Sequence, residues 1–143
     1  MTWSCRALIF ALLLLPLVGP LPAHPQARRQ SALVGTWRIV EFVDWDSAGR
    51  PSYLLGAKPT GYLMYTPTGH VSVHLADTSA NHPIYTSYVG KYTVQGNVVT
   101  HHIELDSTLP GSSGSGPRPF RLHDDTLVLG DGRTWRRTFV RVR

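Results

Sequence analysis

Apolar and polar residues alternate with a period of two through residues 34–142, and no helical period there lasts longer than a turn. Clusters of Gly, Pro, Asn and Asp separate the alternating segments, which is typical of strands joined by turns. The pattern predicts eight strands, at residues 34–45, 61–66, 70–76, 88–95, 98–105, 118–123, 126–129 and 133–142. Most connections are too short for crossovers, so neighbouring strands should pair antiparallel. A meander of this kind closes when its last strand pairs with its first, which predicts an all-β, eight-stranded antiparallel up-and-down β-barrel.

The turn at residues 66–70 fixes which side chains share a face in the first predicted hairpin. It has Pro at the second turn position and Gly where a left-handed backbone is required, which is typical of a three-residue loop with a glycine bulge. Counting outward from this turn places Leu63 and Tyr65 on one face with Val71 and Val73. This face is the more apolar one and is expected to point into the barrel.

The Gly-Asn turn after residue 95 sets the register of the next hairpin. It pairs Tyr92 with His101 and Tyr88 with Leu105 on an apolar face. His102, the next residue along, then points to the opposite, polar face. The two adjacent histidines are therefore expected to lie on different sides of the barrel wall.

The same counting gives inner faces to the first and the last strands. In the C-terminal strands the inner residues are Phe120, Leu122, Leu127, Leu129, Trp135, Arg137 and Phe139. The last three depend on a three-residue loop at 130–132, which buries Trp135, whereas a two-residue Asp-Gly turn would reverse that strand. One face of the first strand holds Trp37, Ile39, Glu41, Val43 and Trp45. Burial of its aromatic and aliphatic members would carry Glu41 inside.

The N-terminus has the anatomy of a signal peptide over residues 1–23, with a basic start, an unbroken apolar run and a proline-rich end. The run is too short to span a bilayer, so no integral membrane span is expected after processing. Cleavage is expected after Ala23, or alternatively after Ala27. A linker over residues 24–32 then leads into one barrel domain over residues 33–143.

This leader predicts a secreted or periplasmic protein. The only cysteine, Cys5, lies within the leader, so the mature domain should have neither a free thiol nor a disulfide. Its stability must then come from its core alone. The sequence leaves the oligomeric state open and favours a monomer.

Composition and motifs exclude several functions. The chain carries 14 Lys and Arg against nine Asp and Glu, but its basic residues are scattered, so no nucleic-acid partner is expected. It contains no nucleophile elbow, phosphate-binding loop or dinucleotide fingerprint, and no cofactor is expected. His102 and Glu104 could bind a metal together with His70 or His74. The register instead places them beside Lys91 on the outer face, which favours a cross-strand charge cluster and no metal site.

Several short motifs are spread over the predicted barrel. Gly35-Thr36-Trp37 opens its first strand, and further blocks lie at residues 59–69, 71–73, 90–94, 99–104 and 127–129. Together these blocks resemble the lipocalin-like domain family of small bacterial and fungal β-barrels over nearly the whole mature chain. The resemblance implies a pocket for a small, mostly apolar molecule, and a short N-terminal turn or helix that plugs one end. The chain departs from the family at residues 76–87 and 106–116, which implies a shorter, more open pocket mouth.

The candidate site residues follow from the register and from this resemblance. Trp37 is expected to plug the closed end, packed under Arg137 by a cation–π contact, with ligand contact as the alternative. His101 could hydrogen-bond a ligand, or act as an acid or base together with Glu41, or be a core histidine satisfied by a tyrosine hydroxyl. The predicted ligand-binding residues are Glu41, Tyr65, Val73, Tyr88, Tyr92, His101, Ile103 and Phe120.

Three functions are compatible with these features. The first is a secreted or periplasmic lipocalin-like protein that binds a small hydrophobic molecule in the barrel interior. The second is a cofactor-free isomerase or cyclase for a small hydrophobic or polyketide-like substrate, with Glu41 and His101 transferring protons. The third is a filled barrel without a guest, which acts through its surface. The size of the internal cavity separates the third from the other two.

Overall fold

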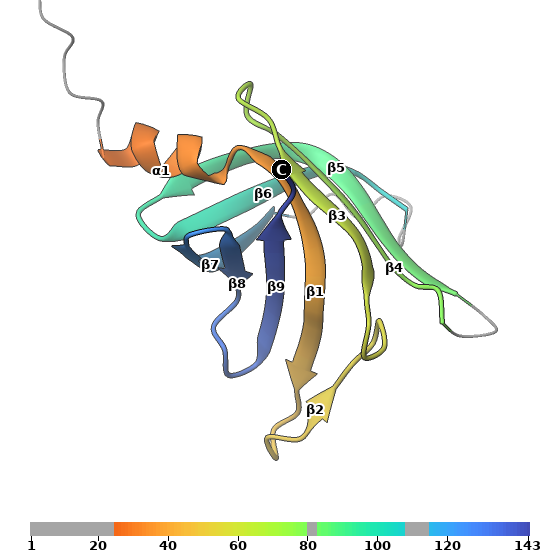
Figure 1. The fold of residues 1–143 in the computed structure, drawn as a ribbon. Coiled ribbons are helices and arrows are strands. Elements are labelled where there is room, and N and C mark those ends of the chain that lie inside the picture. Colours follow the sequence, from red (N-terminus) through yellow and green to blue (C-terminus); the bar gives the residue numbers. More distant parts are fainter. Residues whose placement is uncertain (1–24, 80–82, 108–114) are drawn as a thin grey trace, which may run out of the picture.

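The computed structural model describes residues 25–79, 83–107 and 115–143, and Figure 1 shows their arrangement. These residues form the helix α1 (Pro25–Leu33) and the strands β1 (Gly35–Trp45), β2 (Pro51–Ser52), β3 (Thr60–Tyr65), β4 (His70–Asp77), β5 (Ile84–Gln95), β6 (Val98–Asp106), β7 (Ser115–His123), β8 (Thr126–Leu129) and β9 (Trp135–Arg141). No helix in this part of the chain is long and apolar enough to cross a bilayer. The predicted signal peptide lies outside the described residues.

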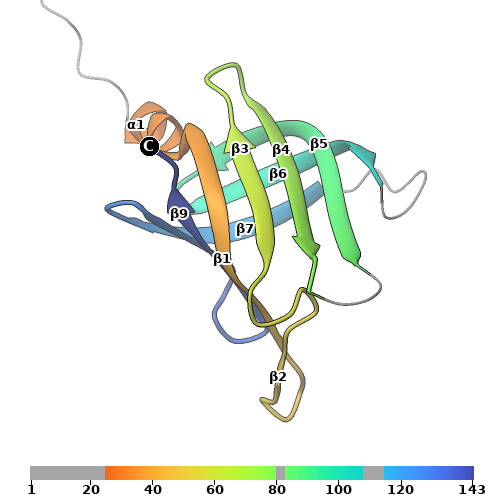
Figure 2. The ribbon, with the colours of Figure 1, turned by 45° about the vertical axis from the view of Figure 1, so that its right-hand side comes forward.

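Eight of the described strands form a closed antiparallel barrel. Each strand from β3 to β9 pairs with its neighbour in sequence, β1 pairs with β3, and β9 returns to pair with β1. The short strand β2 pairs only with the end of β1 and projects from the barrel (Figures 1 and 2). The predicted eight-stranded up-and-down barrel is therefore confirmed.

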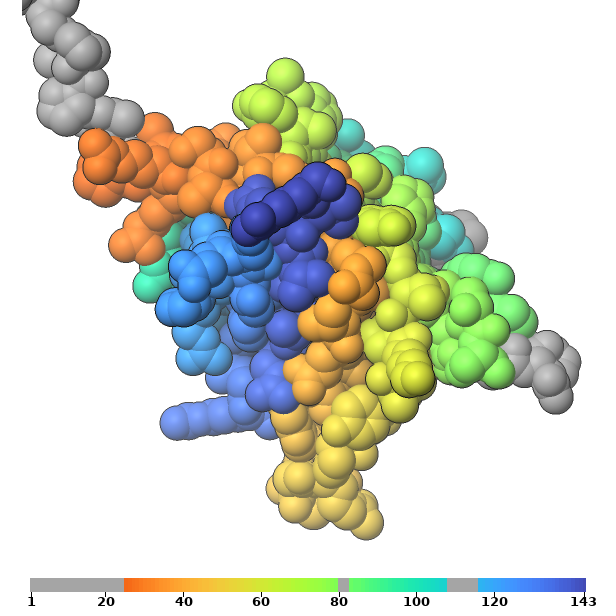
Figure 3. Space-filling model, viewed as in Figure 1, coloured from red at the N-terminus to blue at the C-terminus, as the bar shows by residue number. Residues whose placement is uncertain are grey.

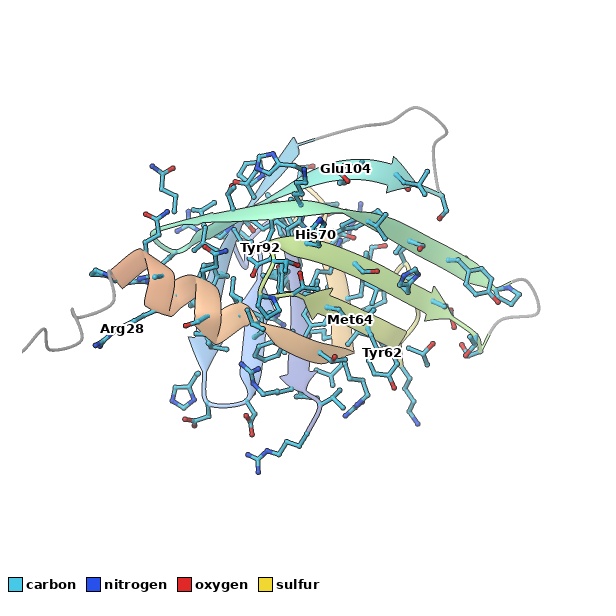
Figure 4. The ribbon with its side chains drawn as sticks, turned by 90° about the horizontal axis from the view of Figure 1, so that it is seen from above. Arg28, Tyr62, Met64, His70, Tyr92 and Glu104 are labelled. Carbon is cyan, nitrogen blue, oxygen red and sulfur yellow. The ribbon has the colours of Figure 1, made fainter. Side chains whose placement is uncertain are left out.

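The register of the hairpins is confirmed where tight turns set it. Tyr65 lies opposite Val71 across β3 and β4, and Tyr92 lies opposite His101 across β5 and β6. His101 is fully buried whereas His102 is exposed, so the two histidines do lie on different sides of the wall. In Figure 4, seen from above, Tyr92 lies within the ring of strands.

The pairing of Tyr88 differs from the expectation. A register shift between Val89 and Gly90 places Tyr88 opposite Asp106 rather than Leu105. A bulge inserts an unpaired residue and bends the strand, which a closed barrel of strongly curved strands requires. Tyr88 still faces inward, and the shift moves Leu105 to an exposed position.

A second bulge corrects the predicted place of Glu41. The β1–β9 register shifts between Ile39 and Glu41, so the alternation of inner and outer side chains reverses after Val40. Glu41 consequently faces the outside of the barrel, where its carboxylate accepts hydrogen bonds from Arg136 Nε and Nη2 at 2.7 and 2.8 Å. Phe42 takes the inner position instead. The prediction of an inward Glu41 was wrong because it assumed unbroken alternation.

The last strand has the predicted orientation although its loop is longer than expected. The connection runs from Gly130 to Thr134, and Arg137 pairs with Leu129 across β8 and β9. The Asp131 carboxylate holds this loop by accepting hydrogen bonds from the backbone N–H groups of residues 133, 134 and 135 at 2.8, 2.8 and 3.2 Å. Like the predicted loop, this connection has an odd number of residues, so the faces of the last strand are as predicted and Trp135 faces inward.

The helix α1 lies at one end of the barrel (Figures 1 and 3). It forms within the segment expected to be a linker, and its Gln26 side chain donates a 2.9 Å hydrogen bond to the carbonyl of Val94. Leu33, the last residue of α1, and Trp37 of β1 are completely buried, and Trp37 Nε1 donates to the carbonyl of Leu33 at 2.8 Å. The predicted N-terminal plug is thus a helix that continues directly into β1.

The partner of Trp37 is Arg141 and not Arg137. The Arg141 guanidinium lies 4.0 Å from the ring centroid of Trp37, and it donates to the carbonyls of Ala32 and Val34 at 2.7 and 2.8 Å. It therefore satisfies carbonyls at the end of α1 that have no partner within the helix. Gly35 makes room for this group, because a Cβ there would lie 2.7 Å from Arg141 Nη1.

Candidate functional site

A cavity of about 580 Å³ occupies the end of the barrel opposite α1. Most of its wall is apolar, with contributions from Phe42, Leu55, Leu63, Val73, Leu75 and Phe139. These side chains come from β1, β3, β4 and β9 and from the loop after β2. The bulge in β1 creates part of this wall, since it turns Phe42 inward. The volume is within the usual range for small-molecule sites.

The mouth of the cavity is lined by exposed apolar side chains. Leu54, Ile84 and Tyr85 have 54%, 41% and 61% of their surfaces exposed. Leu54 comes from the loop after β2, whereas Ile84 and Tyr85 come from the start of β5. Apolar groups at a mouth of this kind give a hydrophobic molecule a continuous path from solvent into the interior.

At its inner end the cavity meets a hydrogen-bonded array of two tyrosines and a histidine. The Tyr65 hydroxyl lies 2.7 Å from His101 Nε2, and the Tyr88 hydroxyl lies 2.8 Å from His101 Nδ1. Tyr65 and His101 are buried in the packed half of the barrel, whereas Tyr88 also lines the cavity. Tyr88 therefore connects the buried imidazole to the guest space.

Burial sets the protonation states of this array. It lowers the pKa of His101 from 6.5 to about 2, with smaller contributions from the positive charge of Arg118 and from His102. Burial also raises the pKa values of Tyr65 and Tyr88, although Arg118 acts in the opposite direction on both. At neutral pH the imidazole and both phenols are therefore uncharged.

Among the residues that the structure describes, two arginines and one aspartate are the charged ones that line the cavity. Arg137 donates through Nη2 to both carboxylate oxygens of Asp44, at 2.8 and 3.1 Å, and its guanidinium lies 3.3 Å from the ring centroid of Phe42. The other arginine, Arg118, lies 5.8 Å from the ring centroid of Tyr88 and donates a hydrogen bond to the carbonyl of Gly116. Arg137 is thus neutralised by a carboxylate within the site.

The predicted ligand-binding residues lie in the cavity lining, in the packed half of the barrel, or in neither place. Val73 and Tyr88 line the cavity. Buried positions in the packed half of the barrel are occupied by Tyr65, Tyr92, His101 and Phe120. The Tyr92 hydroxyl donates to the carbonyl of Thr66 at 3.0 Å. Ile103 is half-buried away from the cavity lining, and Glu41 lies outside the barrel. A ligand contact for any of these residues stays a prediction.

His101 and Glu41 do not form the acid–base pair considered for catalysis. His101 is fully buried between two tyrosine hydroxyls, as in the alternative of a satisfied core histidine. The Glu41 carboxylate is bound by Arg136 and by Thr138, and hydrogen bonding from Arg136 lowers its pKa. The barrel wall separates the two groups.

Sequence reasoning missed Asp44 and Arg118. The position of Asp44 depends on the bulge at Val40, for which the sequence offered one hint: a charged Glu41 in an otherwise apolar inner row. For Arg118 the sequence did contain an indication, because Arg118 alternates with Phe120 and Leu122 on one face of the same strand. An arginine in line with core side chains on one strand indicates a cation that faces the interior.

A closed barrel with a plugged end and an apolar cavity at the other end defines the class of small-molecule-binding β-barrels. Residues 34–84 match the family model described as a lipocalin-like domain. This segment covers β1 to β4, including the Gly-x-Trp opening, the bulge in β1 and much of the apolar cavity wall. The predicted resemblance is therefore confirmed over these residues. No curated protein matched the chain in a sequence comparison.

Proposed function

We propose that this protein binds a small hydrophobic molecule in the cavity at the open end of its barrel, and that it does so as a secreted or periplasmic protein. The observation that carries the proposal is an apolar cavity of about 580 Å³ that opens through a hydrophobic mouth. Burial of apolar ligand surface supplies the affinity, at about 25 cal/mol per Å² before the costs of association. The leader at residues 1–23 supports export.

The cavity argues against a filled barrel that acts only through its surface. It also favours binding over the isomerase or cyclase alternative. That alternative relied on Glu41 and His101, and the Glu41 carboxylate is held outside the barrel by Arg136 at 2.7 Å. A reaction that needs both groups would have to cross the wall between them.

A neutral, environment-sensitive dye such as Nile red tests the proposal directly. We expect saturable binding with a rise in dye fluorescence, and we expect Val73→Trp to abolish it, because the larger ring would fill the cavity. Val89→Trp is the matched control, since Val89 is 37% exposed and does not line the cavity. Equal dye binding by both variants would place the site elsewhere and overturn the proposal.

Export has its own test. When the full chain is expressed with its leader, we expect the exported protein to begin at His24, or at Arg28 if the second cleavage site is used. Cleavage at the second site would remove Pro25, Gln26 and Ala27 from α1. Intact-mass measurement of the secreted or periplasmic fraction distinguishes these products. An uncleaved chain confined to the cytoplasm would contradict this part of the proposal.

A further inference from the structure

The charges that line the cavity do not balance. Arg118 and Arg137 face a single carboxylate, Asp44, and that carboxylate binds Arg137. Among the described residues, the ion pairs do not include one between Arg118 and a carboxylate. All nine acidic residues of the chain lie in the part that the structure describes. One of them, Asp106, pairs with Tyr88 across β5 and β6 and acts on it electrostatically, but it does not line the cavity. Arg118 therefore adds a positive charge to an apolar cavity.

The hydrogen bonds of His101 determine where the Tyr88 proton points. A neutral imidazole has one N–H donor and one acceptor nitrogen, so it donates to one tyrosine and accepts from the other. Tyr65 is buried, and His101 Nε2 is its one hydrogen-bond partner among the described residues. If Tyr65 accepted this bond, its own proton would be buried without an acceptor, which is unfavourable because buried polar groups are almost always hydrogen-bonded.

Tyr65 therefore donates to Nε2, and the N–H at Nδ1 donates to the Tyr88 oxygen. With its oxygen occupied in this way, the Tyr88 hydroxyl proton is available to a different acceptor. Tyr88 and Arg118 both line the cavity, the guanidinium lies 5.8 Å from the Tyr88 ring centroid, and hydrogen bonding from Arg118 acts to lower the pKa of the Tyr88 hydroxyl, so the two donors meet at the same part of the wall. Two converging donors and a positive charge form a site for an anionic oxygen group.

We propose that the cavity binds an amphipathic molecule with an anionic end group, of the carboxylate class, and that Arg118 and the Tyr88 hydroxyl bind this group while the apolar tail lies along the wall toward the mouth. This inference rests on the proposed function and specifies its ligand. A carboxylate without a tail would not fill the cavity, and a tail without a charged end would leave the Arg118 charge without an anionic partner inside the cavity. Tyr65 and His101 act as positioning residues, since they orient Tyr88 without touching the guest.

Calorimetric titration with two probes of equal chain length, decanoate and decan-1-ol, tests this inference. We expect decanoate to bind wild-type protein at least about tenfold more tightly than the alcohol. Arg118→Gln should weaken decanoate binding about 10- to 100-fold, the effect of a lost charged hydrogen bond, and should change alcohol binding less than about twofold. Arg118→Lys should recover part of the loss because it keeps the charge.

Arg121→Gln is the matched control, because Arg121 lies on the same strand but is exposed on the outer side. It removes the same net charge and should leave both affinities within about twofold. Tyr88→Phe provides a second variant that keeps the guanidinium, and it should weaken decanoate selectively by about 3- to 10-fold. Thermal unfolding of each variant establishes that it is folded under the titration conditions.

The outcomes separate the two proposals. Equal affinities for decanoate and decanol, unaffected by Arg118→Gln, would overturn the anionic-ligand inference and leave the hydrophobic-binding proposal intact. Equal losses in Arg118→Gln and Arg121→Gln would also overturn it, since they would indicate long-range attraction rather than contact. Failure of both probes and of the neutral dye to bind would overturn the proposed function itself.

Discussion

A buried imidazole that bridges two phenol hydroxyls makes the stability of the barrel depend on one side chain. We expect His101→Leu to lower the free energy of unfolding by about 2–3 kcal/mol, because it leaves the buried hydroxyl of Tyr65 without its partner. Chemical denaturation followed by circular dichroism measures this loss. The same change at the exposed His102 serves as the control, with an expected effect within about 0.5 kcal/mol. Equal stabilities for the two variants would show that the hydrogen bonds of His101 contribute nothing net.

The lowered pKa of His101 also predicts how stability depends on pH. In the unfolded chain this group takes up a proton as the pH falls below about 6.5, whereas in the folded barrel its pKa is about 2. The unfolded state therefore binds more protons between these values, and the stability present above pH 6.5 is progressively lost as the pH falls. The slope contributed by His101 approaches about 1.4 kcal/mol per pH unit.

Denaturant titrations between about pH 5 and pH 6.5 isolate this effect, because carboxylates are still ionised there. We expect the free energy of unfolding of the wild-type protein to fall more steeply over this range than that of His101→Gln, which has no group to titrate at this position. Parallel slopes for the two proteins would contradict a neutral, buried His101.

At the scale of strands and turns, the hairpin pairings could be predicted from the turn residues, whereas the bulges that let the strands curve into a closed barrel could not. Pro, Gly and Asn at the hairpin turns specify loop length, so the partners of Tyr65 and Tyr92 could be counted from the sequence. The bulges at Val40 in β1 and at Glu104 in β6 have a different cause, because long strands must bend in a closed barrel. No local turn signal marks them, and each reverses the faces of the residues beyond it.

The candidate site could therefore be predicted only in part. Tyr88 and Val73 line the cavity as expected. Each lies an even number of residues along its strand from an inward residue whose pairing a tight turn fixes, Tyr92 for Tyr88 and Val71 for Val73. Glu41 was misplaced by a bulge. The choice of Arg137 as the partner of Trp37 had another cause. Arg137 and Arg141 lie on the same face of β9, and only the stagger of β9 against β1 places Arg141 opposite Trp37.

The junction of α1 and β1 gives a prediction at the scale of elements. We expect Arg141→Ala to lower the free energy of unfolding by about 2 kcal/mol, because it removes a cation–π contact with Trp37 and two hydrogen bonds to the end of α1. Hydrogen exchange should speed up in α1 before it does in β5 and β6. Arg143→Ala is the control, since Arg143 is exposed and bonds to Asp125 at the same end of the barrel wall without an interaction with α1 among the described residues. Unchanged exchange in α1 would show that Arg141 does not hold the helix.

At the scale of the whole molecule, the two ends of the barrel have different roles. The end under α1 is filled by Leu33, Trp37 and the buried tyrosines, and it supplies the core of a domain that has no disulfide. The other end holds a cavity, which leaves apolar wall without protein contacts and lowers stability relative to a filled barrel. A guest in this cavity would restore such contacts, so binding and stability should be linked.

Because a cavity ligand binds the folded barrel and not the unfolded chain, it should raise the stability of the protein by mass action. At a free concentration of about 100 times its Kd, the ligand should add about 2.7 kcal/mol, which corresponds to a rise in Tm of about 10 °C for a domain of this size. Scanning calorimetry with decanoate at several concentrations measures this rise, and Val73→Trp should abolish it while Val89→Trp should not. Ligand that binds loosely to exposed apolar surface would instead favour the unfolded chain and lower the Tm of all three proteins. The sign of the shift, and its loss in the cavity variant alone, therefore distinguish a guest inside the barrel from adsorption on its surface.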